Sequence, residues 1–441
     1  MPALSHHGFE INELIPPAPG AGTWTRFVHQ FEPSEFTGWV DESESWKKTA
    51  YIGDWSSLPN KLIVTGPDAV RFFQDLSVNS FGNFEVGRAK HSVQCSPEGR
   101  VLTEGILMRL GDEEVKFTGG PIYWAEYQFQ KGDYDATLVQ RGTKDFIIQV
   151  QGPRSLDIIE RASGEKHRDY KFLNLRKTTI AGHEVWSLRQ GMSGELGFEL
   201  HGDGAHAVEV HQALLDAGQE FGVRRLGGRT KMVNHVEACF PTPLVDYMPA
   251  IADDLGFAQF LGQTHPELSY LQHFPSSGSH VPSGPTDAYR DPTELGWGRN
   301  IKFDHDFIGS RALEDVVANP ARTMVTLVWN KDDVRDVYDS LFREGTPYDY
   351  MEMPRALFDS LAMDTVVQNG TTVGVSTSRC YSYHFRDMIS LCTIDLAQAR
   401  PGEQVEVIWG SPGSPQKAIR ATVAPAPYKR DNRRVDVTAL P

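Results

Sequence analysis

The stretch RQGMSGELGFEL, from Arg189 to Leu200, decides the fold that we predict for this chain. It joins two strand-like runs, 183–188 (HEVWSL) and 197–201 (GFELH). Its three glycines allow sharp turns or a close approach of the backbone to a ligand. Glu199 follows between two apolar residues, where a carboxylate needs partners because burying an unpaired charge is costly. Two interpretations stay open: a ligand rich in N–H donors, such as a pterin, supplies those partners, or Glu199 meets a protein arginine in a glycine-rich hairpin.

An internal repeat lies ahead of this stretch in the chain. Residues 61–76 (KLIVTGPDAVRFFQDL) and 146–162 (FIIQVQGPRSLDIIERA) each give an apolar strand, a Gly-Pro turn and a helix. Proline suits the first turn of a helix, and apolar residues then recur at helical spacing. The repeat predicts two α+β modules related by a pseudo-twofold axis, although strand–Gly-Pro–helix units are common enough for coincidence to be the alternative.

The rest of the chain supplies further elements. Strands of an antiparallel sheet are expected at 92–94, 101–110 and 114–118, and a helix at 205–218. Residues 239–300 form a long irregular region of the kind that serves as a functional loop. Short strands with turn signals between them predict a small C-terminal β-barrel; they lie at 324–329, 373–376, 389–394, 404–409 and 419–423.

The expected domain organisation is an N-terminal arm (1–30), a first α+β module (31–145), a second module carrying the long loop (146–300), a linker (301–321) and the barrel domain (322–441). A chain of 441 residues accommodates two or three such domains.

Composition narrows the class of protein. With 40% hydrophobic and 23% charged residues, the chain is typical of globular proteins. A formal net charge of −15 argues against nucleic acid or an anionic membrane as the main partner. No apolar run is long enough for a membrane helix, and no secretory signal is visible. The four cysteines form no CxxC pair, which favours free thiols and a cytoplasmic location.

Several familiar catalytic motifs are missing, and no metal site is expected. Asp304-His305-Asp306 has the composition of a metal triad, but helix capping is the better interpretation. Prolines stiffen the loop 239–249 (CFPTPLVDYMP), which presents Asp246 and Tyr247. A tyrosine can act as acid, base or hydrogen-bond donor toward a phenolic oxygen. The alternative is a packed loop with an exposed tyrosine.

These motifs in this order resemble the glycine cleavage T-protein family of folate-dependent aminomethyltransferases. Within that family, the resemblance is greatest to the tetrahydrofolate-dependent aromatic O-demethylases that act on vanillate and 3-O-methylgallate. It covers the chain from about Phe31 to about Tyr428. Its most specific motifs are 151–153 (QGP), 191–194 (GMSG) with Glu199, 241–244 (PTPL), 302–309 (KFDHDFIG), 381–383 (YSY) and 390–395 (SLCTID).

The resemblance implies a three-domain cloverleaf of α+β class, with two ferredoxin-like antiparallel modules, a C-terminal β-barrel and folate in a central channel. It implies that Glu199, with Gly191 and Met192, binds the pterin, and that Glu104 lies near the reactive folate nitrogens. Tyr247 lies within one position of the tyrosine that the demethylases place at the substrate ether. For a carbon–carbon lyase on the same scaffold, Asp246, Tyr247 or a nearby histidine is the candidate base. The aromatic substrate is expected to contact Trp55, Leu58, Gly120, Tyr381 and Tyr383; the last two could instead simply pack.

The departures from the demethylase pattern concern the substrate. Trp55 and Leu58 stand where the vanillate-type enzymes carry Gln and His, and Gly120 stands where they carry an arginine for the benzoate carboxylate. Losing that bidentate clamp argues against a simple benzoate. The gained apolar surface favours a larger, more neutral aromatic, and we expect a lignin-derived dimer of the guaiacyl type.

Three functions are consistent with this sequence. The first is methyl transfer from an aryl methyl ether to tetrahydrofolate, with Tyr247 as the acid. The second is a carbon–carbon lyase that releases formaldehyde from a side-chain CH2OH group without folate. The third is a folate-binding protein without catalytic activity, which the ordered loop at 241–247 argues against. In each case we expect a monomer or homodimer with a small-molecule partner.

Overall fold

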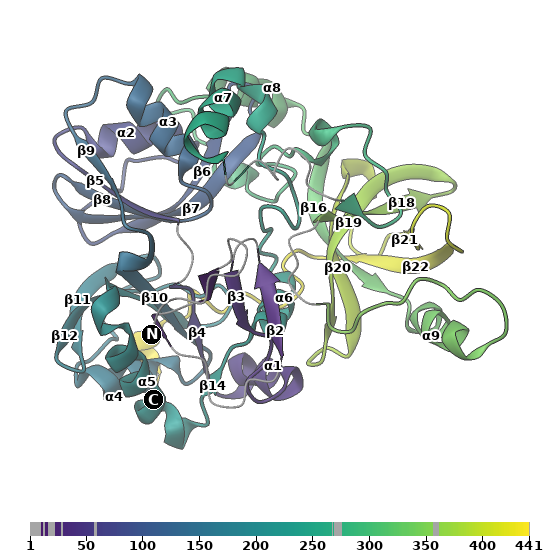
Figure 1. The fold of residues 1–441 in the computed structure, drawn as a ribbon, viewed down its shortest axis with the longest axis horizontal. Helices are drawn as coiled ribbons and strands as arrows, with labels where there is room; N and C mark the ends of the chain where they lie inside the picture. The colour runs from purple at the N-terminus through teal and green to yellow at the C-terminus, as the bar shows by residue number, and fades with distance from the viewer. Residues whose placement is uncertain are drawn as a thin grey trace.

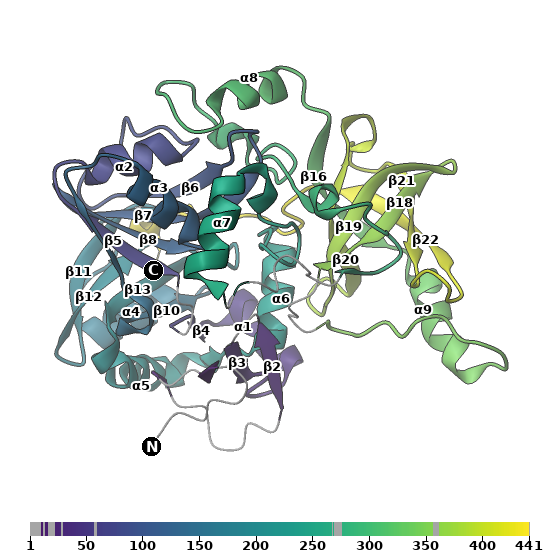
Figure 2. The same ribbon diagram turned by 45° about the horizontal axis from the view of Figure 1, so that its top comes forward.

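The computed structural model describes residues 10–11, 14–15, 23–27, 30–56, 60–266, 268, 276–355 and 361–440. The chain forms two α+β lobes, one above the other in the view of Figure 1, with a β-barrel lobe beside them. Figure 2 shows the same three lobes turned toward the reader, with α6 (Gly228–Glu237) between them. The predicted α+β architecture with a closed C-terminal barrel is confirmed.

The first lobe is built on a five-stranded antiparallel sheet in the order β6-β7-β8-β5-β9. Apolar side chains from its outer face pack with helices α2 and α3 in one buried cluster, which includes Leu62, Phe72 and Phe117. The three strands expected at 92–94, 101–110 and 114–118 are β6, β7 and β8. The elements are β5 (Lys61–Thr65), α2 (Ala69–Leu76), β6 (Ala89–Cys95), β7 (Val101–Gly111), β8 (Glu114–Gly119), α3 (Tyr123–Lys131) and β9 (Thr137–Gln140).

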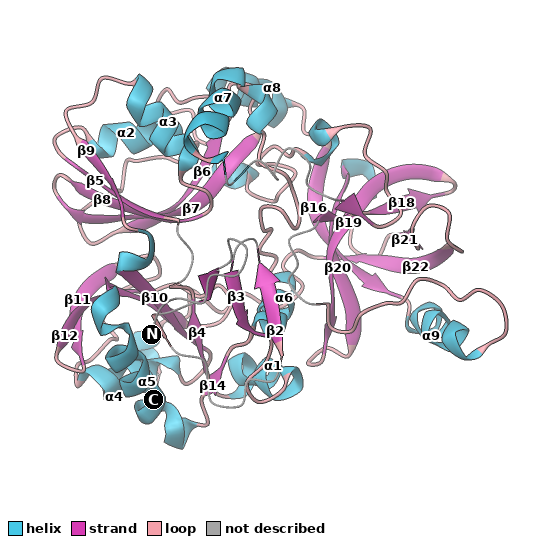
Figure 3. Ribbon diagram, viewed as in Figure 1, coloured by secondary structure: helices cyan, strands magenta, loops and turns pink. Residues whose placement is uncertain are grey.

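The second lobe repeats this arrangement. Its six-stranded sheet has the order β11-β12-β13-β10-β4-β14, and α4 and α5 cover its outer face, as Figure 3 shows. The expected helix at 205–218 is α5, preceded by one 3-10 turn. The elements are α1 (Trp39–Lys48), β4 (Tyr51–Asp54), β10 (Asp145–Gln151), α4 (Ser155–Ser163), β11 (Leu175–Ile180), β12 (His183–Leu188), β13 (Gly197–Asp203), α5 (Ala207–Gly218) and β14 (Arg224–Arg225).

The two sheets exchange one strand each. β4 precedes β5 in the chain yet pairs with β10 of the second sheet, whereas β9 precedes β10 yet pairs with β5 of the first. β4 therefore lies in the second sheet, although its residues fall within the range 31–145 expected for the first module. The segment that leads into the first sheet thus gives β4 to the second sheet, and the segment that leads into the second sheet gives β9 to the first. This reciprocal arrangement is what a pseudo-twofold relationship requires.

Glycine is required at the same point of both echoed turns. Gly66 has φ +137° and Gly152 has φ +126°. A Cβ on Gly66 would lie 2.6 Å from the carbonyl oxygen of Asp135, and one on Gly152 would lie 2.7 Å from that of Thr49. Because both contacts are to the backbone just before the exchanged strand, the glycine lets the helix begin directly against that strand.

The third lobe is a closed barrel of six strands in the order β16-β20-β19-β18-β21-β22. All five predicted strands are present, and β18 was missed. A helix also interrupts the region 239–300, where the sequence predicted irregular structure: α7 begins after Asp254, whose side chain accepts from the Phe257 amide. The elements are α7 (Leu255–Thr264), α8 (Ser310–Ala318), β16 (Arg322–Trp329), α9 (Lys331–Asp339), β18 (Asp364–Gln368), β19 (Thr371–Ser382), β20 (Asp387–Asp395), β21 (Gln404–Trp409) and β22 (Lys417–Ala424).

Smaller strands complete the description: β1 (Glu10–Ile11), β2 (Trp24–Phe27) and β3 (Gln30–Pro33) form a three-stranded sheet, and β15 (Ser276–Ser277) pairs with β17 (Leu361–Ala362). None of the described helices combines the length and apolarity that a membrane crossing needs.

Candidate active site

The inner face of the second sheet carries a row of polar residues. The strand register places Gln149 of β10 directly between Glu199 of β13 and Gly53 of β4. Two residues further along these strands, Tyr51 of β4 and Gln151 of β10 are paired on the same face of the sheet. Alternate residues of a strand point to opposite faces, so these side chains face away from the apolar cluster that packs against α4 and α5. The sheet therefore separates a hydrophobic core from a polar inner surface.

Glu199 is fully surrounded on this surface, with 4% of its area exposed. Its Oε2 accepts from the side-chain amides of Gln149 (2.8 Å) and Gln190 (3.0 Å), and its Oε1 accepts from Nε2 of His201 (2.9 Å). Burial alone would raise its pKa, but these hydrogen bonds lower the pKa of Glu199 below its usual value. Glu199 is an ionised, buried carboxylate held by neutral donors, and its partners are not the arginine that the alternative interpretation required.

The glycine-rich turn before Glu199 has a fixed shape. A Cβ on Gly191 would lie 2.0 Å from the carbonyl oxygen of Glu195, so only glycine fits there. Met192 places its sulfur 2.9 Å from the amide nitrogen of Gln149, beside Glu199. From the C-terminal segment, Lys429 donates to the Ser193 carbonyl (2.8 Å) and forms an ion pair with Glu195 (2.5 Å). The barrel lobe thus holds the turn that carries the predicted pterin-binding residues.

Glu104 lies on the facing sheet, on β7. Its Oε2 lies 2.8 Å from Nε2 of His91, and the side-chain amide of Asn300 donates to Nδ1 of the same ring (3.1 Å). With Nδ1 accepting, Nε2 carries the hydrogen and donates it to Glu104. The buried carboxylate is therefore held by a histidine that a side-chain amide orients.

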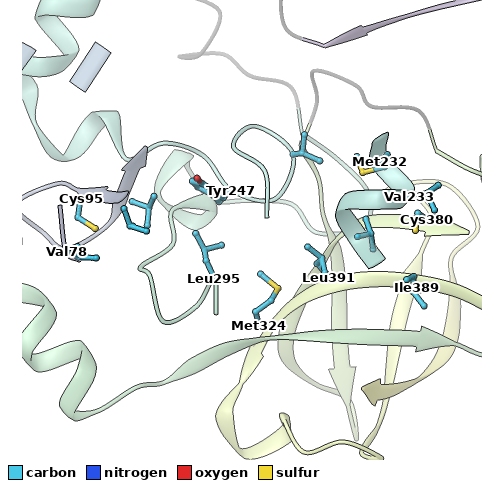
Figure 4. Packing of buried hydrophobic residues seen from close by; sticks show 14 of the residues in the cluster. Val78, Cys95, Met232, Val233, Tyr247, Leu295, Met324, Cys380, Ile389 and Leu391 are labelled. Carbon is cyan, nitrogen blue, oxygen red and sulfur yellow. The ribbon is translucent and has the colours of Figure 1, made fainter. Parts of the chain in front are cut away.

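Tyr247 is completely buried in the proline-rich loop, so the alternative of an exposed tyrosine is wrong. Its ring lies edge-on to Trp297 (6.2 Å between centroids), which in turn contacts the ring of His91. It belongs to the buried cluster where the three lobes meet, together with Cys95 and Leu295 (Figure 4). Among the described residues, its hydroxyl has no hydrogen-bond partner. Burial, reinforced by the nearby charges of Glu104 and Asp246, raises the pKa of Tyr247 well above its usual range, so the group stays a neutral phenol.

Asp246 stabilises the loop that presents Tyr247. Its Oδ2 accepts from the Thr242 amide (2.8 Å), and its Oδ1 accepts from the hydroxyl of Thr377 (2.5 Å) at a bulge of β19. Burial raises the pKa of Asp246, although these hydrogen bonds oppose the shift. Leu244 adopts φ +68° in the same loop, a conformation that costs on the order of 1–3 kcal/mol for a residue other than glycine. Both carboxylate oxygens are thus engaged in fixing the loop to the barrel.

Trp55 stacks on the imidazole of His235 from α6, with 5.6 Å between ring centroids and 8° between ring planes. Lys231 lies on α6 as well, and its ammonium is 4.2 Å from the centre of the Trp55 ring. The indole N–H of Trp55 and Nε2 of His235 are buried without a partner among the described residues. Leu58, predicted with Trp55 to contact the substrate, lies outside the described residues.

The remaining predicted substrate residues occupy two different places. Gly120 lies against β7, where a Cβ would come within 2.5 Å of the Glu104 carbonyl oxygen, so a larger residue at 120 would displace the strand that carries Glu104. Tyr381 and Tyr383 instead pack edge-on against Trp39 of α1, each 6.1 Å away. No described contact joins those two tyrosines to Trp55, Tyr247 or Glu199, and they connect the barrel to α1.

Two groups of potential metal ligands lie elsewhere. The carboxylate of Asp304 is hydrogen-bonded to Nδ1 of His305 (2.9 Å) and to the hydroxyl of Ser80 (2.6 Å). His183, His206 and Glu209 gather where β12 begins and α5 starts, partly exposed to solvent. Neither group contacts the residues of the inner sheet faces described above.

Two α+β modules with facing sheets, joined to a barrel, define the aminomethyltransferase architecture. The structure is similar to that of the glycine cleavage system aminomethyltransferase T from Bartonella henselae, with a TM-score of 0.68 and 16% identity over 93% of this chain and 95% of that one. The family described as the GCVT N-terminal domain matches residues 20–252, and the chain belongs to this family.

Two relatives with known activities are similar over almost the whole chain. A sesamin methylene transferase from Sinomonas sp. (strain No.22) is 35% identical and covers 93% of this chain and 94% of its own length. A syringate O-demethylase from Sphingobium sp. (strain NBRC 103272 / SYK-6) is also 35% identical, with 91% and 90% covered. The chain is an enzyme of the one-carbon transferase class.

Several residues of the site were not singled out from the sequence. Gln149 had a signal, since it interrupts the apolar strand FIIQVQ, and His201 lies two residues after Glu199 and so shares its face of the strand. His91, Asn300 and His235 gave none, because their partners come from distant parts of the chain.

Proposed function

We propose that this enzyme removes the methyl group of a methoxylated aromatic compound of the guaiacyl type and transfers it to tetrahydrofolate. One observation carries the proposal: Tyr247 is a buried phenol kept protonated, with no described protein partner for its hydroxyl. A phenolate is a poor leaving group, so the ether oxygen must receive a proton or a hydrogen bond as the carbon–oxygen bond breaks. The methylene transferase and the O-demethylase among its relatives support a one-carbon reaction on an aromatic ether.

The residues present fit a folate. An ionised carboxylate offers about four acceptor positions. The three described hydrogen bonds leave Oε1 of Glu199 with a single partner, His201, so that oxygen can accept from a pterin N–H. Nδ1 of His201 is buried and unpartnered among the described residues, which adds a second polar atom for a ligand. When bound, tetrahydrofolate would supply the nitrogen that accepts the one-carbon unit.

The residues of the candidate site then have separate roles in the reaction. Tyr247 donates its proton toward the ether oxygen as the carbon–oxygen bond breaks, and the proton that the methylated folate nitrogen releases would restore the Tyr247 phenol. The Thr242–Asp246–Thr377 contacts hold Tyr247 in place against the barrel. Glu104, oriented by His91, places negative charge beside Tyr247 and stabilises positive charge that develops near the reacting carbon. Burial of all these groups keeps water out of the transfer.

A second reaction is the release of formaldehyde from a side-chain hydroxymethyl group of a lignin dimer, without folate. The observation that favours it is the Glu104–His91 pair, because only Oε2 of Glu104 has a described partner and a buried carboxylate beside a phenol can serve as a base. On either route we propose that the enzyme acts in the cytoplasm, since its four cysteines are free thiols.

One assay separates the two reactions. The purified protein is incubated with guaiacyl monomers and dimers, with and without tetrahydrofolate, and both 5-methyltetrahydrofolate and formaldehyde are measured. The proposal expects a demethylated phenol and methylated folate only when folate is present. Formaldehyde formed at the same rate without folate selects the lyase.

A further inference from the structure

The imidazole of His235 has protein contacts at its ring face and at Nδ1, but none at Nε2. It is buried on α6, stacked on Trp55 and in contact with the ring of Phe240 at 5.5 Å. Its Nδ1 lies 3.3 Å from the hydroxyl oxygen of Thr242. Its Nε2 has no partner among the described residues.

The hydrogen-bond network assigns the tautomer of this ring. The Thr242 hydroxyl donates its one hydrogen to the carbonyl oxygen of Phe240, at 3.2 Å. That oxygen can then only accept from His235, so the hydrogen of the neutral ring lies on Nδ1. Nε2 is left as a bare acceptor.

The ring stays neutral over the working range of the protein. Burial, with a smaller contribution from the Lys231 ammonium, lowers the pKa of His235 to about 3. Lys231 is itself paired with Glu32 and with the carbonyl of Asp54, so two of its three hydrogens are engaged. A buried acceptor with no donor is unfavourable, and this one lies on a ring stacked against Trp55, a residue predicted to contact the substrate, which points to a ligand group that donates to it.

We propose that Nε2 of His235 binds a hydroxyl group on the aromatic ring of the substrate, so that the enzyme selects aromatic ethers carrying a free phenolic hydroxyl. The inference rests on the proposed function for the aromatic nature of the ligand. Trp55 offers the adjoining π-surface and an unpartnered indole N–H. A methoxyphenol supplies both groups that the site lacks: a hydroxyl donor for His235 and an ether acceptor for Tyr247.

One loop couples the two contacts. Thr242 contacts the ring of His235 through its hydroxyl, and its backbone amide donates a hydrogen bond to the Asp246 carboxylate. Tyr247 follows directly in the chain. The residue that sets the tautomer of His235 therefore also positions the proposed acid, which ties recognition of the hydroxyl to the place of the ether oxygen.

The tautomer is measured first, on the whole protein without ligand. Nitrogen-15 NMR of histidine-labelled protein, with His235→Gln used to assign the signal, distinguishes a hydrogen on Nδ1 from one on Nε2. The proposal expects the Nδ1–H form across pH 6–8. An Nε2–H form, or a charged ring, would overturn it whatever the substrate is.

Ligand preference is measured next, by calorimetric titration with 2-methoxyphenol and with 1,2-dimethoxybenzene, which lacks the hydroxyl hydrogen. The wild type should bind the phenol about tenfold more tightly, because the analogue leaves the buried acceptor unpaired. His235→Asn keeps a donor toward Thr242 but has no atom at the Nε2 position, so it should abolish the preference. His235→Gln, which places an amide oxygen near that position, should retain part of it.

Equal binding of the two compounds by the wild type, an unchanged preference in His235→Asn, or no binding of either compound would each overturn the inference. Thermal unfolding of both variants checks that they fold. Since neither measurement involves folate or turnover, a failure of the proposed methyl transfer would leave these results interpretable, and their failure would leave methyl transfer standing.

Discussion

Replacing Tyr247 by phenylalanine removes one oxygen atom that makes no described hydrogen bond with the protein. The ring keeps its contact with Trp297 and its place in the buried cluster. Because an unpaired buried hydroxyl carries a desolvation penalty, on the order of 1–3 kcal/mol, its loss should leave the free energy of unfolding unchanged or raise it. If Tyr247 is the acid, kcat for demethylation should fall roughly 10²- to 10⁴-fold.

Tyr170→Phe is the matched control. Tyr170 is also buried, but its hydroxyl lies 2.7 Å from Ser187 and 3.1 Å from His167. This variant should lose about 1–3 kcal/mol of stability with little change in kcat, the reverse of Tyr247→Phe. The assay is kcat under saturating folate, measured beside urea unfolding for both proteins. A Tyr247→Phe enzyme that turns over at the wild-type rate, or that is destabilised as much as the control, would refute the assignment.

Three further predictions concern the cofactor, the echoed turn and pH. Glu199→Gln should weaken tetrahydrofolate binding by tenfold or more, measured by calorimetry, and an unchanged affinity would place the pterin elsewhere. Gly152→Ala should cost at least about 2 kcal/mol of unfolding free energy more than Gly164→Ala, whose Cβ would meet no atom within 4 Å, and equal losses would contradict the backbone clash at Thr49. His235 has a folded-state pKa of about 3 against an ordinary 6.5, so the unfolded chain binds the extra proton first and stability falls as pH drops below 6.5. Between pH 7 and pH 5 the wild type should lose roughly 2 kcal/mol more than His235→Asn in urea unfolding, and parallel losses would show that the ring is not neutral at pH 5.

The repeated units of the fold could be predicted because their signals are local. Each Gly-Pro turn lies within a short stretch in which an apolar strand changes to helical spacing. The exchange of β4 and β9 could not be predicted, since it depends on which distant edge each strand joins and not on its own residues. β18 was missed for a related reason: its DTVVQ sequence is short, and only two of its residues are buried.

The candidate site was predictable only in part. Glu199 and Tyr247 stand out because a charge among apolar residues and a polar residue between prolines are visible in one stretch. Helix α6 gave no such signal, because Lys231, Asn234 and Glu237 look like residues of a solvated helix. The structure buries all three, because α6 lies where the lobes meet: Lys231 donates to Glu32 and to the Asp54 carbonyl, and Glu237 accepts from Trp46 of α1 and Ser382 of β19. Asp246 shows the converse: its sequence context suggested chemistry, whereas its contacts fix the loop.

The central claim is that the methyl group of an aromatic ether passes to folate at the surface between the two sheets. A guaiacyl substrate labelled with carbon-13 in its methoxy group, incubated with the enzyme and tetrahydrofolate, tests this directly by NMR. The account predicts that the label appears in 5-methyltetrahydrofolate, at a rate that Tyr247→Phe lowers roughly 10²- to 10⁴-fold. Label that stays in the methoxy group while unlabelled formaldehyde accumulates without folate would contradict it.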